Sequence, residues 1–311
     1  MWGLYVSVRS VKWFPNQSRL ITQMRGVALE ESEVMMVQEQ LSNTLFSGKT
    51  VFVTGGGSGI NLGVARNFAA LGANVAICGR TQEKLDGAAI ELRALNAHVK
   101  GKVLPVAADV RDYAAVDSAV TRTRAELGAI DVMICAAAGN FLCPAEALTP
   151  NGFKTVVDID LQGSFHASRA AFEQLKETRG CVIFISAAQA FVPMVYQVHV
   201  AAAKAGIDIM MKNLAIEWGR HGIRTHSIVP GPIEGTEGMR RLSPPEGANN
   251  RKANIPLGRF GSVDDIGQAA VFLASPLASY ITGVVLCVDG GSSLVGSAPW
   301  NAMVEKMDLK R

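Results

Sequence analysis

The chain has 311 residues, of which 49% are hydrophobic and 18% are charged, which is ordinary for a globular protein. Its formal net charge is +3, but residues 1–29 hold four basic side chains and no acidic one, so residues 30–311 sum to −1. A nearly neutral body has no basic face for a nucleic-acid backbone, so nucleic acid is excluded as an expected partner. No window approaches the roughly 20 apolar residues of a membrane span, so no membrane association is expected.

Residues 1–45 differ from the rest of the chain, because their first part is basic and contains serine but no acid. They lack the apolar core of a secretory signal. They vaguely resemble an organelle transit peptide, and the alternatives are a disordered extension or an upstream start codon. We expect an extension over 1–45, disordered or partly helical, a single domain over 46–296, and a C-terminal tail over 297–311.

Short apolar runs recur along the domain and end near turn residues or motifs. Each is too short for a helix and too uniformly apolar for a half-exposed strand, so each predicts a buried parallel strand. The runs are TVFVTG (50–55), ANVAICG (73–79), GKVLPVAAD (101–109), IDVMICAAA (130–138), GCVIFISAA (180–188), GIRTHSIVPG (222–231) and GVVLCVDGG (283–291). Amphipathic helical stretches separate them, which predicts βαβ units. The fold class is therefore α/β: a doubly wound, Rossmann-type parallel sheet of seven strands, with helices on both faces and its ligand crevice at the carboxyl ends of the strands.

The scattered cysteines contain no C-x-x-C pair, and their settings, such as AICGR and VMICA, are those of a protein core. They predict reduced, buried thiols in a cytoplasmic enzyme, and no metal site. The five are Cys78, Cys135, Cys143, Cys181 and Cys287.

A glycine-rich turn follows the first strand and precedes a helical pattern. Such a turn lets the backbone approach a pyrophosphate and directs helix N–H groups toward it. Its residues include Gly55, Gly57, Ser58, Gly59, Ile60 and Asn61. The spacing resembles the nucleotide fingerprint of the short-chain dehydrogenase/reductase family, and the resemblance extends from about Leu45 to Leu294. The last glycine of that fingerprint is replaced by Asn61, which predicts either a helix pushed slightly outward or an amide near the phosphates.

The second strand ends at Arg80, and no acid follows before Glu83. A site that prefers NAD places an acid here to hold the ribose 2′-OH, whereas the planar guanidinium of Arg80 matches a 2′-phosphate. We therefore expect NADPH/NADP as the cofactor, although Arg80 alone is also compatible with a solvated helix start. The resemblance adds further residues around the cofactor: Asp109, Val110, Ala137, Gly139, Lys204, Pro230, Gly231, Ile233 and Thr236.

The family's usual catalytic Asn, Ser, Tyr and Lys are mostly replaced. Lys204 occupies the lysine position, but Val200 stands at the tyrosine position, Ala187 at the serine position and Asp160 at the asparagine position. Valine cannot transfer a proton to a carbonyl oxygen, so ordinary ketone chemistry is not supported. We expect Asp160 and Lys204 to be catalytic. Three readings stay open: Tyr196 or His199 as a substitute acid, and Asp160 as a structural carboxylate.

Longer stretches resemble one branch of the family, the peroxisomal-type 2,4-dienoyl-CoA reductases, which also lack the tyrosine and carry the aspartate. They are AAGNFLCPA (137–145), FKTVVDID (153–160), PGPIEGTEG (230–238) and LASPLASYITG (273–283). The resemblance implies NADPH-dependent reduction of a conjugated carbon–carbon double bond in a fatty acyl-CoA.

The same resemblance implies that Arg111, Phe141 and Arg241 line the substrate side, and that residues of about 231–255 form a lid. It also implies a homotetramer, packed through the long helical stretches that follow the fourth and fifth strands. Two other functions stay open: a short-chain reductase of a ketone or another enoyl thioester, and a catalytically silent NADP-binding scaffold.

Overall fold

The computed structural model describes residues 44–96, 101–242 and 252–304. The predicted extension over 1–45 therefore lies almost wholly outside the described residues, as do parts of the predicted lid and tail. The described residues belong to one compact unit that begins at Ser42. Among them, no helix is long and apolar enough to cross a membrane.

The core is one parallel sheet of seven strands in the order β3-β2-β1-β4-β5-β6-β7. The strands are β1 (Thr50–Thr54), β2 (Asn74–Gly79), β3 (Val103–Ala107), β4 (Ile130–Cys135), β5 (Cys181–Ile185), β6 (Arg224–Pro230) and β7 (Val284–Val288). The strand order reverses between β1 and β4, which is the switch point where doubly wound sheets bind their ligands. The predicted fold class and all seven predicted strands are confirmed.

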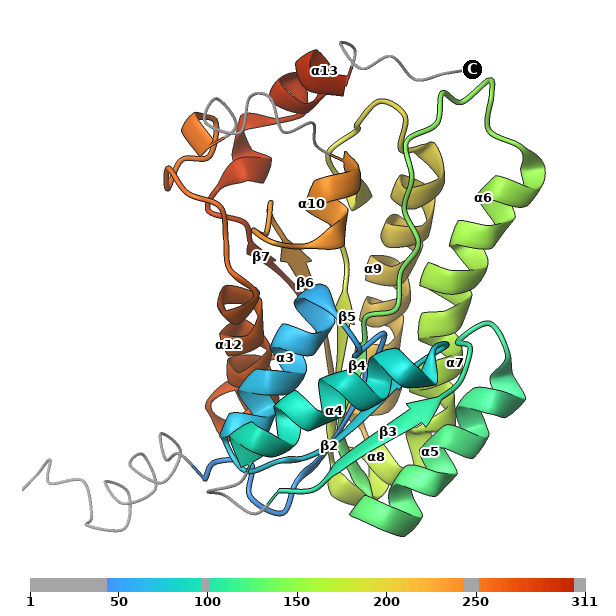
Figure 1. Ribbon diagram of the computed structural model, residues 1–311, viewed down its shortest axis with the longest axis vertical. Helices are drawn as coiled ribbons and strands as arrows, with labels where there is room; N and C mark the ends of the chain where they lie inside the picture. The colour runs from blue at the N-terminus through green and yellow to red at the C-terminus, as the bar shows by residue number, and fades with distance from the viewer. Residues whose placement is uncertain (1–43, 97–100, 243–251, 305–311) are drawn as a thin grey trace, which may run out of the picture. The chain divides into compact units, whose positions relative to one another are not determined.

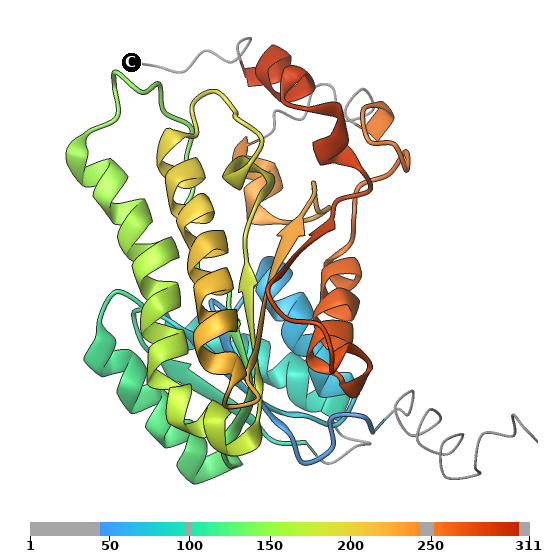
Figure 2. The same ribbon diagram turned by 180° about the vertical axis from the view of Figure 1, so that it is seen from behind.

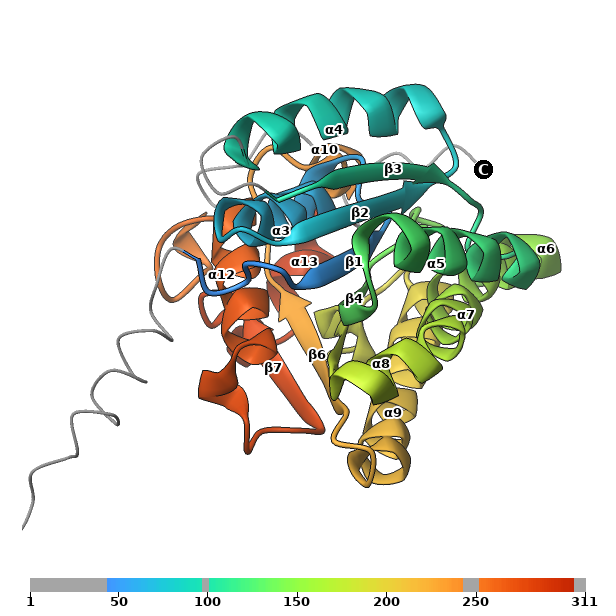
Figure 3. The ribbon, with the colours of Figure 1, turned by 90° about the horizontal axis from the view of Figure 1, so that it is seen from below.

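Helices cover both faces of the sheet (Figures 1 and 3). One face carries α3 (Gly59–Ala70), α4 (Gln82–Asn96) and α12 (Val263–Ala274). The other carries α5 (Tyr113–Leu127), α7 (Gly163–Ala170), α8 (Phe172–Thr178) and α9 (Val198–Gly219). Each layer buries an apolar cluster against the strands, so the sheet has a hydrophobic core on both sides.

The remaining elements are short, and several lie beyond the carboxyl ends of the strands. Seen from behind, α10 and α13 lie above the ends of β5 and β6 (Figure 2). These elements are α6 (Pro150–Val157), η1 (Asp158–Gln162), η2 (Ala188–Ala190), α10 (Glu237–Leu242), η3 (Pro276–Ala278), η4 (Ser292–Val295) and α13 (Ala298–Val304).

Local sequence explains where several helices begin. The Asp112 side chain accepts hydrogen bonds from the Ala114 and Ala115 N–H groups and so caps α5. Thr149 caps α6, whose first residue is Pro150, a residue with φ preset for that position. Ser262 and Asp265 form a reciprocal capping box at the start of α12.

The structure corrects two expectations about burial. β3 and β7 were predicted as buried strands, but only two β3 residues are buried, and β7 is half-buried with Cys287 exposed, because these are the two edge strands. Of the five cysteines, Cys78, Cys135 and Cys181 are buried, whereas Cys143 is half-buried. All five are free thiols, as expected.

Candidate active site

The glycine-rich turn joins β1 to α3, and two of its glycines have positive φ angles. Gly55 has φ +68°, and a Cβ atom there would lie 2.6 Å from Asn61 Nδ2 and 3.1 Å from Ala137 Cα. Only glycine fits this position. At Gly59, with φ +59°, an added Cβ meets no protein atom, so the space before the first turn of α3 is open to a ligand. This geometry suits a phosphate group facing the helix N-terminus.

The structure shows what Asn61 does at the position where the family's fingerprint has a glycine. Its Nδ2 donates to Ala136 O at 2.9 Å and to Gly55 O at 3.3 Å, so its amide ties the glycine turn to the end of β4. The helix packs closely all the same, because Gly63 lies directly against Val263 of α12. The amide N–H groups thus bond backbone carbonyls, and the expected outward shift of the helix is not needed to accommodate Asn61.

The replacement Asn61→Gly is expected to keep cofactor binding and to lower stability. It removes two hydrogen bonds, each worth about 1 kcal/mol net, so the free energy of unfolding should fall by about 2 kcal/mol. A denaturant melt measures the stability, and an NADPH titration measures the binding. Loss of binding would show that the amide is needed at the phosphates.

A cavity of about 450 Å³ opens at the carboxyl ends of β1, β4, β5 and β6. Its volume is within the range of small-molecule sites. Many predicted site residues line it: Ser58, Gly59, Ile60, Asn61, Gly139, Asp160, Lys204, Pro230, Gly231, Ile233, Thr236 and Arg241. Other predicted residues do not line it: Gly55, Gly57, Arg80, Asp109, Val110, Arg111, Ala137 and Phe141.

A buried ion pair lies in this cavity. Lys204 Nζ is 3.1 Å from Asp160 Oδ2, and the two side chains are 7% and 1% exposed. Lys204 also donates to Ile185 O at 2.9 Å, and the second Asp160 oxygen accepts the Gly139 N–H at 2.7 Å. The pair therefore joins four segments: the turn that carries Asp160, α9, the end of β5 and the loop after β4.

Asp160 lies in a short irregular turn that interrupts the surrounding helices. Residues Asp158–Gln162 form a π-helical turn between α6 and α7, and Asp160 lies at its centre. The long helical stretch predicted after the fourth strand is therefore divided into α6, this π-helical turn, α7 and α8. π-Helical turns inside α-helices often occur at functional sites.

The positions of the missing tyrosine and serine are apolar in three dimensions as well. Val200 is 2% exposed, and both Val200 and Ala187 line the cavity. No hydroxyl is therefore available at either place. Ser186, one residue before Ala187, also lines the cavity, and its buried Oγ has no hydrogen-bond partner among the described residues. Asn140 Oδ1 is in the same situation.

The two substitute acids do not line the cavity. Tyr196 precedes α9, which begins at Val198, and has a φ of +64°. His199 is completely buried, and its ring lies 4.4 Å from that of Phe141. Burial lowers the pKa of His199, which favours the neutral ring, and neither ring nitrogen has a hydrogen-bond partner among the described residues.

The predicted adenosine end of the site lies beside β2 and β3. Arg80 is exposed directly after β2, whereas Asp109 follows β3. Arg111 folds back onto Asp109, with Nη2 2.6 Å and Nε 3.1 Å from the same oxygen. These hydrogen bonds lower the pKa of Asp109, so its carboxylate is charged and already paired. Val110 packs against Gly163 of α7, which gives it a structural role.

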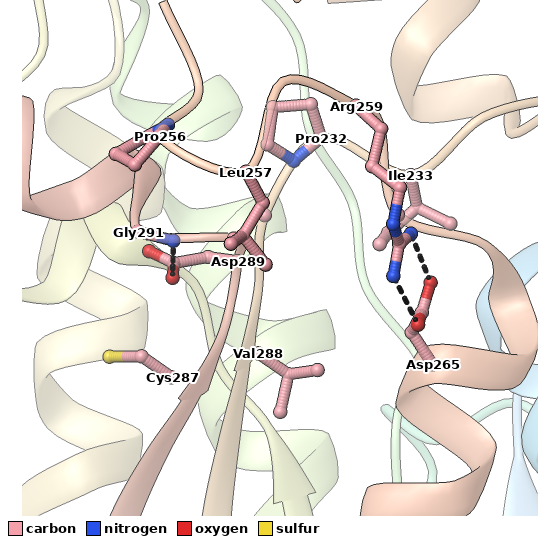
Figure 4. Close-up of a pocket in the computed structure, with 13 residues that line it drawn as sticks. Pro232, Ile233, Pro256, Leu257, Arg259, Asp265, Cys287, Val288, Asp289 and Gly291 are labelled. Atoms are coloured by element: carbon pink, nitrogen blue, oxygen red, sulfur yellow. Dashed lines mark hydrogen bonds and ion pairs between the residues drawn. The ribbon is translucent and has the colours of Figure 1, made fainter. Parts of the chain in front are cut away.

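A second cavity of about 480 Å³ lies between the loop that follows β6 and the end of β7. It shares Gly231, Pro232 and Ile233 with the cavity already described. Figure 4 shows Arg259 and Asp265 paired on one wall, at 2.8 and 2.9 Å, with Asp289 beside Gly291 on another. The Asp160–Lys204 pair does not line this second cavity, so we place the chemistry in the first cavity.

Comparison with known proteins shows which family the chain resembles along most of its length. A family model described as "Enoyl-(Acyl carrier protein) reductase" matches residues 55–293. The peroxisomal 2,4-dienoyl-CoA reductase of Saccharomyces cerevisiae is 46% identical over 81% of this chain and 87% of its own length. The peroxisomal 2,4-dienoyl-CoA reductase of Rattus norvegicus is 44% identical over 80% of this chain and 85% of its own length. A solved short chain dehydrogenase from Bacillus anthracis superposes with a TM-score of 0.70 at 40% identity, covering 79% of this chain and 96% of that one.

The chain belongs to the short-chain dehydrogenase/reductase family. It is therefore an oxidoreductase that uses a nicotinamide cofactor. The open space before α3 and the polar groups of the cavity fit such a cofactor.

The cavity of this short-chain reductase is also lined by residues that were not predicted from the sequence. The missed residues include Asn140, Ser186, Gln189, Met194 and Trp300. Asn140 stands in a stretch that carried the resemblance, so its position was available as a signal. Trp300 lies in the segment predicted as a tail, and nothing in its local sequence pointed to the cavity.

Proposed function

We propose that this chain uses NADPH to reduce the conjugated double bonds of a 2,4-dienoyl-CoA to a single 3-enoyl double bond. One observation carries the proposal. The cavity keeps a buried Asp160–Lys204 pair but presents Val200 and Ala187 where a ketone reductase needs hydroxyls. Reduction of a conjugated thioester protonates carbon, so it needs an oxyanion donor and a proton source but no tyrosine at a carbonyl oxygen.

The chain's own residues can serve both needs. When bound, NADPH supplies the hydride that reduces the diene. Ser186 has a buried hydroxyl with no hydrogen-bond partner in the described part of the chain, and this hydroxyl is suited to donate to the thioester oxygen as negative charge develops there. A preorganised donor of this kind is typically worth ~10²–10³ in rate.

Lys204 donates one N–H group to Ile185 O and lies at ion-pair distance from Asp160, so the ammonium has a further N–H group that can be directed into the cavity. We assign this group to a ribose hydroxyl of the cofactor, where the lysine also supplies positive potential. Asp160, fixed by the Gly139 N–H, holds Lys204 in place and orients a water that delivers the proton.

One assay tests this proposal. NADPH oxidation is followed with 2,4-hexadienoyl-CoA, 2,4-decadienoyl-CoA, a panel of ketones and simple enoyl-CoAs. We expect turnover with the dienoyl-CoA substrates alone. Preferred turnover of a ketone would favour the other reductase function, and NADP binding without turnover of any substrate would favour a scaffold.

The assembly is also a proposal. α9 and α6 lie side by side, and α9 exposes large apolar residues such as Ile209 (58%) and Ile216 (81%). We expect these helices to pack between subunits of a homotetramer. Light scattering coupled to size-exclusion chromatography measures the mass, and a monomer of 33.0 kDa would contradict this expectation.

The location of the chain stays a prediction. Its free, mostly buried thiols suit the cytoplasm, whereas the yeast and rat relatives are named as peroxisomal proteins. Cell fractionation with an antibody against the chain decides between the two compartments.

A further inference from the structure

The C-terminal helix α13 contributes a wall to the active cavity. It follows β7 through the short helix η4, and both elements place residues on the cavity, Ser292 from η4 and Trp300 from α13. Val304, the last residue of α13, is completely buried. The helix is thus packed onto the domain at the same side as the cavity.

Trp300 is held against a specific turn of the chain. Its indole Nε1 donates to Val195 O at 3.3 Å. The neighbouring residue Met194 lines the cavity beside it. Gln197, which is completely buried, ties the same turn to the loop after β4, because its Nε2 donates to Phe141 O at 3.1 Å.

The cavity wall combines polar and apolar side chains. Asp160, Lys204 and Ser186 gather where the cofactor and the reacting carbons belong. Met194 and Trp300 present a thioether and an indole instead. A phosphate-bearing CoA moiety gains little from such groups, whereas an alkyl chain packs well against both.

We propose that Trp300, together with Met194, forms the wall on which the distal part of the substrate's acyl chain lies, so that residue 300 sets the chain-length preference. This inference rests on the proposed reduction of a dienoyl-CoA. Each buried methylene strengthens binding roughly fourfold, so a long chain depends on this wall far more than a short one.

The test compares two substitutions at Trp300 with two substrates. Trp300→Ala removes the wall, and Trp300→Phe keeps an aromatic face but removes the hydrogen bond to Val195. For Trp300→Ala we expect a KM about tenfold higher with 2,4-decadienoyl-CoA, a change under threefold with 2,4-hexadienoyl-CoA, and kcat and the Kd of NADPH within twofold. Trp300→Phe should stay within threefold of the wild type for both substrates.

A matched control separates the wall from the helix that carries it. Ala302 is exposed on α13, and Ala302→Gly weakens the helix while leaving the indole in place. Its KM values should stay within twofold. An equal KM rise for both substrates in Trp300→Ala, no rise at all, or equal damage from Trp300→Phe would overturn the inference.

Failure of the proposed function can be recognised separately. If the wild type oxidises NADPH with neither dienoyl-CoA, the proposed function is wrong. The wall is then judged by calorimetric binding of decanoyl-CoA and hexanoyl-CoA to the NADP-loaded wild type and Trp300→Ala. A loss confined to decanoyl-CoA supports the wall, and equal affinities for the two proteins exclude it.

Discussion

Replacing Lys204 with alanine is expected to lower the turnover of 2,4-hexadienoyl-CoA by more than tenfold while the protein still folds. The ammonium group lies 3.1 Å from Asp160 and donates to Ile185 O at 2.9 Å, so its loss removes the positive charge from the reaction site. The rate is measured as kcat at saturating NADPH. Lys212→Ala, an exposed lysine on the same helix, is the matched control and should keep the wild-type rate.

Asp160→Ala should have a similar effect, because the two residues act as a unit. Each single replacement leaves one charge buried without its partner, which typically costs about 3–5 kcal/mol of stability. The double variant removes both charges. It should therefore lose no more activity than the worse single variant and melt at a higher temperature than either. Wild-type turnover in either single variant, or rate losses that multiply in the double variant, would contradict this coupling.

The sheet was predictable because its signal is repeated. Seven apolar runs alternate with amphipathic stretches, and parallel strands buried on both faces tolerate few polar residues. The glycine turn was predictable for a related reason, since the positive φ angles at Gly55 and Gly59 restrict the residue type. The ends of strands were less certain: the runs continue past Cys135 and Ile185 because apolar residues also line the site beyond both strands.

Other features depend on contacts between distant segments, which a local pattern does not encode. Asp160 and Lys204 were identified from their positions, but their pairing depends on a π-helical turn that interrupts an otherwise regular helical pattern. Tyr196 was considered as a substitute acid from its spacing to Lys204 along the sequence, whereas its φ of +64° puts it in a turn before α9. Trp300 reaches the cavity only because α13 folds back over the strand ends, and no periodicity reveals that return.

The proposed preference for NADPH provides the second large expected effect, and we attribute it to charges at the ends of β2 and β3. Arg80 lies within electrostatic reach of Asp109, whose carboxylate is already paired with Arg111. Arg80 is exposed and has no ion pair among the described residues, so its charge is available to an anionic group. A 2′-phosphate is favoured there, and the nearest acid after β2, Glu83, stands on α4 rather than on the loop.

Arg80→Ala is therefore expected to lower kcat/KM for NADPH by about tenfold or more and to change kcat/KM for NADH by less than twofold. The size follows from a charge-assisted hydrogen bond, typically worth about 1.5–3 kcal/mol, which the 2′-hydroxyl of NADH cannot form to the same degree. Steady-state rates at varied cofactor concentration measure both values. Arg122→Ala, which breaks only an exposed pair with Glu126 on α5, is the control and should leave both values unchanged.

A wild type that uses NADH as efficiently as NADPH would exclude the preference itself. An equal loss for both cofactors in Arg80→Ala would show instead that Arg80 binds a part that the two share, so the 2′-phosphate would need another partner.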